Sequence, residues 1–413
     1  MVQIHFSGYD PGNPPDRFLI RGIGRLLTPE EEVRDAALLV EEGRICAIPG
    51  ARALQSLADL PSVDVGGATV APGFIDIHIH GGAGADALDG TQEALRTIAS
   101  FHAAHGTTAL LATVATSPWP EVLSAVEAVA EAAGAPDVRG ARILGLHLEG
   151  PFLNPARRGA QPLESLLPPT QSLLEEVFQR AGEHWVLITL APELWPEELI
   201  RFLVERGVTV SLGHTDATWA QARRAIALGA RQATHLFNAM RPFHHREPGV
   251  VGAVLLEGQV RAEIVADGIH VHPAAIALAS RMKGSEGIVL VTDAIRAAGL
   301  GDGVYELFGQ EVTVSGGEAR LSDGTLAGST LTMERAVANM VRWGFPLSQA
   351  VSMATAVPAT VAGVGSRKGR IAKGYDADLV VLDDAFTVHL TFVEGKIAFL
   401  RGSSVPGRES LWR

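Results

Sequence analysis

Cysteine is nearly absent from this chain of 413 residues, and no long apolar run is present. Its single cysteine, Cys46, cannot form an internal disulfide, which favours a reducing compartment. No apolar run approaches the roughly 18 residues of a membrane-spanning helix. The opening residues MVQIHFSGYD lack the basic and then apolar pattern of a signal peptide. We therefore expect a cytoplasmic protein that does not contact a membrane.

Basic residues are fewer than acidic ones. Lysine and arginine number 34 against 46 acidic residues, which gives a net charge of −12 at pH 7. This balance argues against nucleic acid or an anionic membrane as a partner, but it allows a local basic pocket for an anionic substrate. Hydrophobic residues make up 47% of the chain, so a large core can form. The length fits one large α/β barrel with a smaller appendage, or two to three ordinary domains.

The pattern of the sequence changes near residue 72. Before that point, short apolar segments separated by glycine predict brief strands. After it, apolar runs alternate with helical patterns, and this predicts a (β/α)8 TIM-type barrel, although a doubly wound sheet has the same alternation. The predicted strands are 74–80, 108–114, 143–149, 186–191, 208–214, 232–236, 261–266 and 287–293.

The C-terminal part of the chain returns to β-type patterns. Residues 303–326 alternate as hairpins do, and short strands are expected near the end of the chain. We expect the two β-rich ends to pair into one small β-sandwich domain. The predicted domains are thus 1–71 and 359–413 for the small domain, with 72–358 for the barrel.

Titratable side chains stand at the ends of the predicted strands. In a parallel barrel these ends meet at one mouth, where catalytic groups lie. His78 and His80 are two residues apart on one strand, so both can reach a single ion. Imidazole and carboxylate together suit zinc, or iron or manganese. The strand-end residues are His78, His80, Glu149, His214, His235 and Asp293, and His270 follows the seventh strand.

Several of the histidines, and Asp76, can also be interpreted without a metal ion. His78 and His80 alone would be read as satisfied core histidines, and only the joint placement favours a metal site. His102 and His105 precede a glycine on a predicted helix and are expected at the surface of its last turn. His147 is expected in a core or supporting role, and Asp76 in a structural one.

Eight short motifs follow one another along the chain. They are PGFIDIHIHG, HLEGPF, GHTDA, THLFNAM, REPG, ADGIHV, LVTDA and GSTLTM. With these motifs the chain resembles the amidohydrolase superfamily, and within it the N-acetylglucosamine-6-phosphate deacetylases. PGFID.H.H alone marks only the superfamily, whereas HLEGPF combined with THLFNAM and REPG is far more specific. The resemblance covers nearly the whole chain.

The resemblance implies a role for each matching residue. The site would hold one or two divalent ions, with zinc favoured, and the protein would be a homodimer. Gln161 stands where family members usually carry a sugar-contacting histidine. The implied roles are principal metal ligands for Glu149, His214 and His235, an optional second-metal pair for His78 and His80, catalytic acid/base for Asp293, phosphate-binding turn for Asn238 and Ala239, substrate contact for His270, and phosphate contact in the neighbouring subunit for Arg246.

The implied reaction is metal-dependent hydrolysis of N-acetyl-D-glucosamine 6-phosphate to D-glucosamine 6-phosphate and acetate. Gln161 leaves the galactosamine isomer open as a substrate. Amidohydrolases acting on cyclic amides or N-acyl amino acids are disfavoured, because they often use a carboxylated lysine where this chain has Glu149. A non-catalytic scaffold with the same barrel would lack metal ligands, and none of the core set is missing here.

Overall fold

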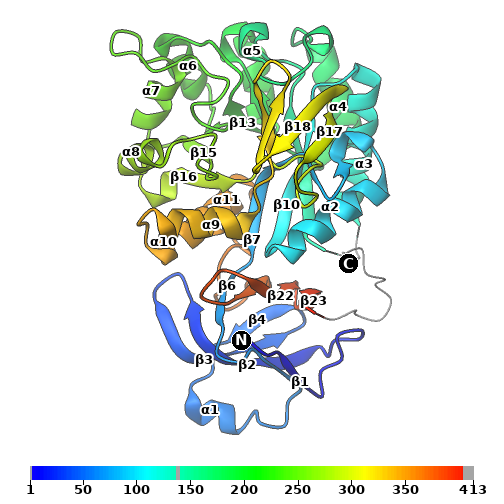
Figure 1. Cartoon of the computed structure of the whole chain (residues 1–413), viewed down its shortest axis with the longest axis vertical. Helices are drawn as coiled ribbons and strands as arrows, with labels where there is room; N and C mark the ends of the chain where they lie inside the picture. Colours follow the sequence, from blue (N-terminus) through cyan, green and yellow to red (C-terminus); the bar gives the residue numbers. More distant parts are fainter. Residues whose placement is uncertain (1, 136–139, 403–413) are drawn as a thin grey trace.

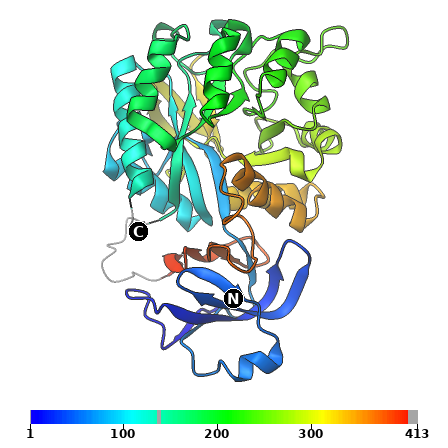
Figure 2. The same ribbon diagram turned by 180° about the vertical axis from the view of Figure 1, so that it is seen from behind.

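A computed structural model describes residues 2–135 and 140–402 of the chain. Figures 1 and 2 show a barrel of strands and helices stacked on a smaller β domain, with the first strands of the chain in the smaller domain. No helix within the described residues is both long and apolar enough to cross a membrane.

Eight parallel strands form the barrel, and they follow one another around the sheet in sequence order. A doubly wound sheet would reverse direction part-way, so this order settles the choice in favour of the barrel. Backbone bonds from Asp293 N to His78 O (2.9 Å) and from His80 N to Ala294 O (2.9 Å) join the last strand to the first. The strands are β7 (Phe74–Ile79), β10 (Thr107–Ala115), β11 (Arg142–Glu149), β12 (Trp185–Leu190), β13 (Thr209–Leu212), β14 (Gln232–Ala233), β15 (Arg261–Val265) and β16 (Ile288–Val291).

Helices cover the outside of the barrel, so its strands are buried on both faces and read as continuous apolar runs. Several helices begin at a side chain that accepts a backbone N–H, for example Thr91, Thr170 and Thr218. The barrel helices are α2 (Gln92–Ala104), α3 (Trp119–Gly134), α4 (Gln171–Ala181), α5 (Glu197–Glu205), α6 (Trp219–Ala227), α7 (Gly249–Leu256), α8 (Pro273–Lys283), α9 (Met333–Arg342), α10 (Leu347–Met353) and α11 (Ala356–Val361).

The small β domain is built from both ends of the chain, as the sequence predicted. Its central contact is the antiparallel pairing of an early strand with a late one, in which Val70 lies opposite Val381. The domain has its own apolar core, which includes Phe18, Ile20 and Phe392. Its nine strands are β1 (His5–Ser7), β2 (Arg17–Leu27), β3 (Glu32–Glu41), β4 (Arg44–Ala47), β5 (Ser62–Asp64), β6 (Thr69–Pro72), β21 (Leu379–Leu382), β22 (Val388–Val393) and β23 (Lys396–Leu400).

The domain boundaries at 71/72 and 358/359 stay a proposal, which the end of β6 at Pro72 supports. The predicted domain runs on to residue 413, and residues 403–413 lie outside the described part of the chain. A single short helix, α1 (Ala51–Gln55), connects β4 to β5.

A separate four-stranded antiparallel sheet occupies the region predicted as hairpins. It consists of β17 (Gly303–Leu307), β18 (Gln310–Ser315), β19 (Glu318–Leu321) and β20 (Leu326–Ser329). Figure 1 shows β17 and β18 (yellow) against the barrel, away from the small β domain. Bonds from Ser329 N to Asp293 O (2.8 Å) and from Ile295 N to Ser329 O (3.0 Å) fasten β20 to the segment after β16. The sheet is therefore fixed next to the barrel mouth.

Candidate metal centre

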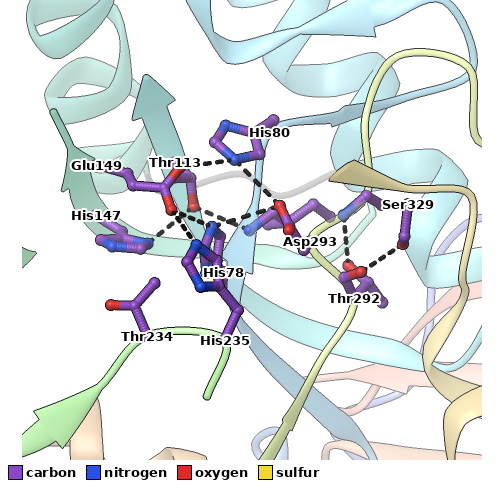
Figure 3. Close-up of polar contacts among 12 residues, drawn as sticks. His78, His80, Thr113, His147, Glu149, Thr234, His235, Thr292, Asp293 and Ser329 are labelled. Atoms are coloured by element: carbon purple, nitrogen blue, oxygen red, sulfur yellow. Dashed lines mark hydrogen bonds and ion pairs between the residues drawn. The ribbon is translucent and has the colours of Figure 1, made fainter. Parts of the chain in front are cut away.

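Four imidazoles surround the carboxylate of Glu149, which ends β11. Glu149 Oε1 lies 3.2 Å from His214 Nε2, 3.1 Å from His235 Nε2 and 3.3 Å from His78 Nε2. The other oxygen, Oε2, lies 3.2 Å from His80 Nε2. Figure 3 shows three of these imidazoles, those of His78, His80 and His235, around the Glu149 side chain. The carboxylate at the end of β11 thus contacts side chains from the ends of three other strands, β7, β13 and β14.

Asp293 completes a second group on the opposite side of this carboxylate. Its Oδ1 lies 3.3 Å from His80 Nε2 and 3.5 Å from His78 Nε2 (Figure 3). Two sets of potential ligand atoms therefore lie side by side, and in each set the atoms are within 4.8 Å of one another. The sets are Glu149, His214 and His235, and His78, His80 and Asp293.

Unusual backbone geometry directs several of these side chains into the mouth. His214, His235 and Asp293 each follow a barrel strand closely, and their φ angles are +47°, +28° and +50°. L-residues rarely adopt positive φ, and each instance costs on the order of 1–3 kcal/mol. Such strain persists where surrounding structure enforces it, and it gathers at functional sites.

Hydrogen bonds at the far ring nitrogens determine which imidazole atoms carry lone pairs. His214 Nδ1 donates to the carbonyl oxygen of Arg157 at 2.8 Å, and His78 Nδ1 donates to Glu263 Oε2 at 3.0 Å. In the neutral ring, each Nε2 then presents a lone pair, and these lone pairs face the carboxylate oxygens of Glu149. Lone pairs opposed in this way require positive charge between them, so the donor set fits a divalent cation.

The pKa values of the histidines and carboxylates in the two ligand sets also indicate that positive charge is favoured there. Burial disfavours a charged His80, but Asp293 and Glu149 outweigh burial and raise the pKa of His80 to about 9. The pKa of His78 is likewise held well above its usual value against burial, chiefly by the charges of Glu149 and Asp293. Burial would raise the pKa values of both carboxylates, yet the neighbouring imidazoles lower them. A bound cation would replace the protons that these histidines hold without it.

Supporting groups lie beneath the cluster, and the sequence indicated only some of them. Glu263, on β15, is fully buried and was not predicted, although a glutamate within the apolar run RAEIV is a signal that could have been used. His147 was expected in a supporting role. Its ring nitrogens lie 3.1 Å from Thr113 Oγ1 and 2.8 Å from Thr189 Oγ1, away from the Glu149 carboxylate. Asp76 accepts from the backbone N–H of His78 at 3.3 Å and so has the structural role expected of it.

The prediction that His102 lies at the surface is wrong. Its side chain is fully buried, and its Nε2 donates to the carbonyl oxygen of Gly81 at 3.0 Å. Burial lowers the pKa of this imidazole to about 3. His105, which follows α2, is half-buried and contacts Glu334 Oε1 at 2.7 Å. The last turn of α2 therefore faces the protein, and His102 holds the segment that follows His80.

A cavity of about 230 Å³ opens at the two sets of potential ligands. Its lining brings together most of the residues predicted from the sequence, namely His80, Glu149, Gln161, His214, His235, Asn238, Ala239, His270 and Asp293. Ile295, Leu307, Phe308 and Leu326 add an apolar wall that the sequence did not predict. His78 lies buried beneath the cavity. A larger groove of about 430 Å³ between β2 and α10 contains neither of the two ligand sets.

Two of the predicted substrate residues have informative surroundings. Gln161 donates to Glu149 Oε2 at 2.9 Å and accepts from Thr116 N at 2.7 Å, so it holds the bridging carboxylate. Arg246 is exposed, and its guanidinium lies 2.9 Å from the ring of His245. It is not part of the lining of this cavity.

Comparison with known proteins agrees with this geometry. The model of the amidohydrolase family matches residues 69–398. The chain belongs to the amidohydrolase family. This match spans the barrel and most of the late strands of the small domain, and it confirms the resemblance seen in the motifs.

Within this amidohydrolase family, the chain is similar to sugar-phosphate deacetylases. It is 40% identical over 396 residues to N-acetylglucosamine-6-phosphate deacetylase of Bacillus subtilis, covering 93% of this chain and 98% of that protein. It is 38% identical over 378 residues to N-acetylgalactosamine-6-phosphate deacetylase of Escherichia coli O157:H7, covering 91% and 97%. A solved mutant of the Mycobacterium smegmatis N-acetyl-D-glucosamine-6-phosphate deacetylase, in complex with N-acetyl-D-glucosamine-6-phosphate, superposes with a TM-score of 0.86 at 35% identity, covering 93% of this chain and all of that one.

Proposed function

We propose that this protein hydrolyses the acetamide of N-acetyl-D-glucosamine 6-phosphate, giving D-glucosamine 6-phosphate and acetate. The observation that carries this proposal is the pair of ligand sets around Glu149, one of which includes Asp293, at a single cavity. The deacetylases to which the chain is similar supply the substrate class.

We assign Glu149, His214 and His235 as the principal metal ligands, and His78 and His80 as ligands of a second ion. A divalent cation held there would polarise the amide carbonyl and lower the pKa of a nearby water to about 7. Zinc suits this mixture of imidazole and carboxylate, and iron or manganese are the alternatives. The bridging position of Glu149, which contacts both His78 and His80, supports two ions.

We assign proton transfer to Asp293. Its lowered pKa keeps the carboxylate ionised at neutral pH, so it can accept a proton from the attacking water. The same group then returns the proton to the departing amine, and one carboxylate acts first as base and then as acid. Asp293 contacts His78 and His80. It therefore lies on the side of these two histidines and not among Glu149, His214 and His235.

Substrate binding is assigned to Asn238 and Ala239 for the phosphate and to His270 and Gln161 for the sugar. Ala239 has a φ of +49°, a turn geometry that suits the proposed backbone contact. Arg246 is assigned to the phosphate in the neighbouring subunit of a homodimer, and its exposure outside its own cavity supports that placement. A cytoplasmic location is proposed as well, supported by the single cysteine.

N-acetylgalactosamine 6-phosphate is the second candidate substrate. It is favoured by one observation, namely that Gln161 is held by Glu149 and Thr116 at a position where family members usually carry histidine. The similarity to the E. coli galactosamine enzyme supports the same alternative.

Acetate release tests the proposal directly. The substrates are N-acetylglucosamine 6-phosphate, N-acetylgalactosamine 6-phosphate, unphosphorylated N-acetylglucosamine and an N-acetyl amino acid. Hydrolysis of a cyclic amide, which releases no acetate, is followed as opening of the ring. We expect the highest kcat/KM with N-acetylglucosamine 6-phosphate. Asp293→Asn should keep its metal content while kcat falls about 10²- to 10⁴-fold. Higher activity on the cyclic amide or the amino acid would refute the proposed function.

A further inference from the structure

Phe308 occupies a backbone position that normally takes a small polar residue. It is the first residue of the two-residue turn between β17 and β18, where Leu307 pairs with Gln310. The φ angles of Phe308 and Gly309 are +53° and +76°, as in a type I′ turn. Such turns favour Asn-Gly, Asp-Gly or Gly-Gly, and a bulky side chain at positive φ is an outlier.

The other two-residue hairpin turns in the described residues follow the usual preference more closely. Glu42-Gly43, Ala83-Gly84, Gly316-Gly317 and Glu394-Gly395 connect their strands with positive φ at both positions. These turns begin with glutamate, alanine or glycine, whereas the β17–β18 turn begins with the bulkier phenylalanine. Local conformational preference therefore does not account for Phe308, and departures of this kind are expected at functional sites.

The ring of Phe308 is directed at the metal cluster. Its centroid lies 5.6 Å from that of His80, with an edge-on angle of 73°. Together with Ile295, Leu307 and Leu326 it forms the apolar wall of the cavity. Asn238 and Ala239 line the same cavity from the segment that follows β14. β14 is not a neighbour of β7, the strand before His80, because other barrel strands lie between them in both directions. The cavity thus has a polar side and an apolar side.

The apolar wall is held rigidly. Leu307 is buried in the core of the four-stranded sheet with Val312 and Val314. Gln310 donates to the carbonyl oxygen of Ala160 at 2.7 Å, which ties the turn to the loop that carries Gln161. The last strand of the same sheet is bonded through Ser329 N to the backbone of Asp293. A wall built this way keeps a fixed distance from the reacting groups.

We propose that Phe308 sets the size of the acyl group that the enzyme removes. The inference rests on the proposed deacetylase function. The amide carbon carries an oxygen, a nitrogen bearing the sugar, and an alkyl group. With the oxygen toward the Glu149 cluster and the sugar phosphate toward Asn238, the alkyl group faces the wall of Phe308. Phe308 therefore leaves room for acetyl and excludes longer chains, acting as a specificity-determining residue.

The test compares N-acetyl-, N-propionyl- and N-butyryl-glucosamine 6-phosphate as substrates of Phe308→Asn. Asparagine is favoured at this turn position, so the hairpin should keep its stability while the ring is lost. Because one methylene in an apolar pocket changes specificity about 10- to 200-fold, we expect the propionyl-to-acetyl ratio of kcat/KM to rise at least tenfold. Phe308→Leu, which is smaller but still apolar, should give an intermediate ratio.

Phe386→Asn is the matched control. Phe386 also has positive φ (+63°) and is half-buried, but it lies between β21 and β22 in the small domain. Its variant should keep the wild-type ratio. An active Phe308→Asn enzyme with an unchanged propionyl-to-acetyl ratio of kcat/KM would overturn the proposal and leave the deacetylase function intact. The same conclusion would follow if kcat/KM fell equally for all three substrates while thermal unfolding stayed unchanged. A wild-type enzyme that acts on none of them would overturn both.

Discussion

At the barrel mouth, nitrogen lone pairs of the histidines face the carboxylate oxygens of Glu149. This arrangement explains the roles of several single residues. His214 and His78 have their Nδ1 atoms committed to a carbonyl and a carboxylate, so their Nε2 atoms must meet Glu149 as acceptors. The repulsion is relieved by protons or by a cation. A residue that fixes a tautomer therefore matters as much as a ligand.

Glu263 is such a residue, and its exchange should change metal binding. In Glu263→Gln the charged acceptor for His78 Nδ1 is lost, while size and burial are kept. We expect the variant to bind the ion on the His78 side about 10- to 100-fold more weakly, and so to retain fewer ions per subunit after dialysis. Metal analysis measures this, with Glu311→Gln on the exposed edge of β18 as the control. Unchanged stoichiometry and affinity would rule out the positioning role.

The sequence predicted that the candidate ligands would lie together, because strand ends in a parallel barrel converge, a rule that needs no coordinates. It did not predict Glu263 or Phe308. The first acts through a neighbouring strand, and the second reaches the site from a hairpin whose orientation is set by packing. The partners of Gln161 were also beyond prediction, because they come from the loop geometry around Thr116.

Among elements, the longer strands were located well and the shorter ones less so. β10 and β11 lie within one residue of the predicted 108–114 and 143–149 at all four ends. The sixth strand was expected over 232–236, but β14 ends at Ala233, because the chain turns into the left-handed conformation at His235. Strand ends that carry ligands are shortened by the geometry that points the ligands inward.

Helix α2 was predicted correctly as a helix, but the outward direction assigned to its last turn was wrong. A short hairpin, β8 (Gly81–Gly82) and β9 (Ala85–Asp86), packs on this turn and takes the bond from His102. A helical pattern does not reveal that a two-stranded hairpin will cover the end of the helix.

Burial of neutral His102 should make the fold sensitive to acid. The unfolded imidazole binds a proton below its usual pKa near 6.5, while the folded one stays neutral until about pH 3. Stability is therefore lost as the pH falls through this window, by about 2 kcal/mol between pH 6 and pH 4. His102→Gln keeps a donor for Gly81 and removes the titration, so its unfolding midpoint should decline less steeply with acid. Equal slopes in both proteins would contradict the account, and exposed His5→Gln should match the wild type.

At the scale of the whole molecule, a buried ion cluster connects the barrel to the small domain. Lys368 Nζ lies 2.9 Å from both Asp376 Oδ2 and Asp378 Oδ2, and 3.1 Å from Glu394 Oε1. Arg142, at the start of barrel strand β11, contacts Glu394 at 2.7 Å. The cluster thus joins the barrel to the small domain. The sequence predicted that the ends would pair, but not this junction, because Arg142 is far from the other charges in the chain.

Removing the lysine should destabilise the protein strongly. Lys368→Met leaves the buried carboxylate of Asp378 without its cation, whereas Asp376 still pairs with Arg367. Loss of one partner from a buried pair costs about 3–5 kcal/mol. Thermal or urea unfolding measures the change. Lys373→Met is the control, since Lys373 is exposed and should tolerate the exchange within about 0.5 kcal/mol. Similar stabilities for the two variants would show that the junction contributes little.

The central claim is that Glu149, His214 and His235 share one divalent cation that the deacetylation requires. Anomalous diffraction from crystals of active protein, purified without added metal, tests it most directly. We expect a peak above the absorption edge of the bound metal, about 2.0–2.2 Å from a carboxylate oxygen of Glu149 and from Nε2 of both histidines. Crystals of protein that releases acetate but shows no such peak between these three residues would contradict the account.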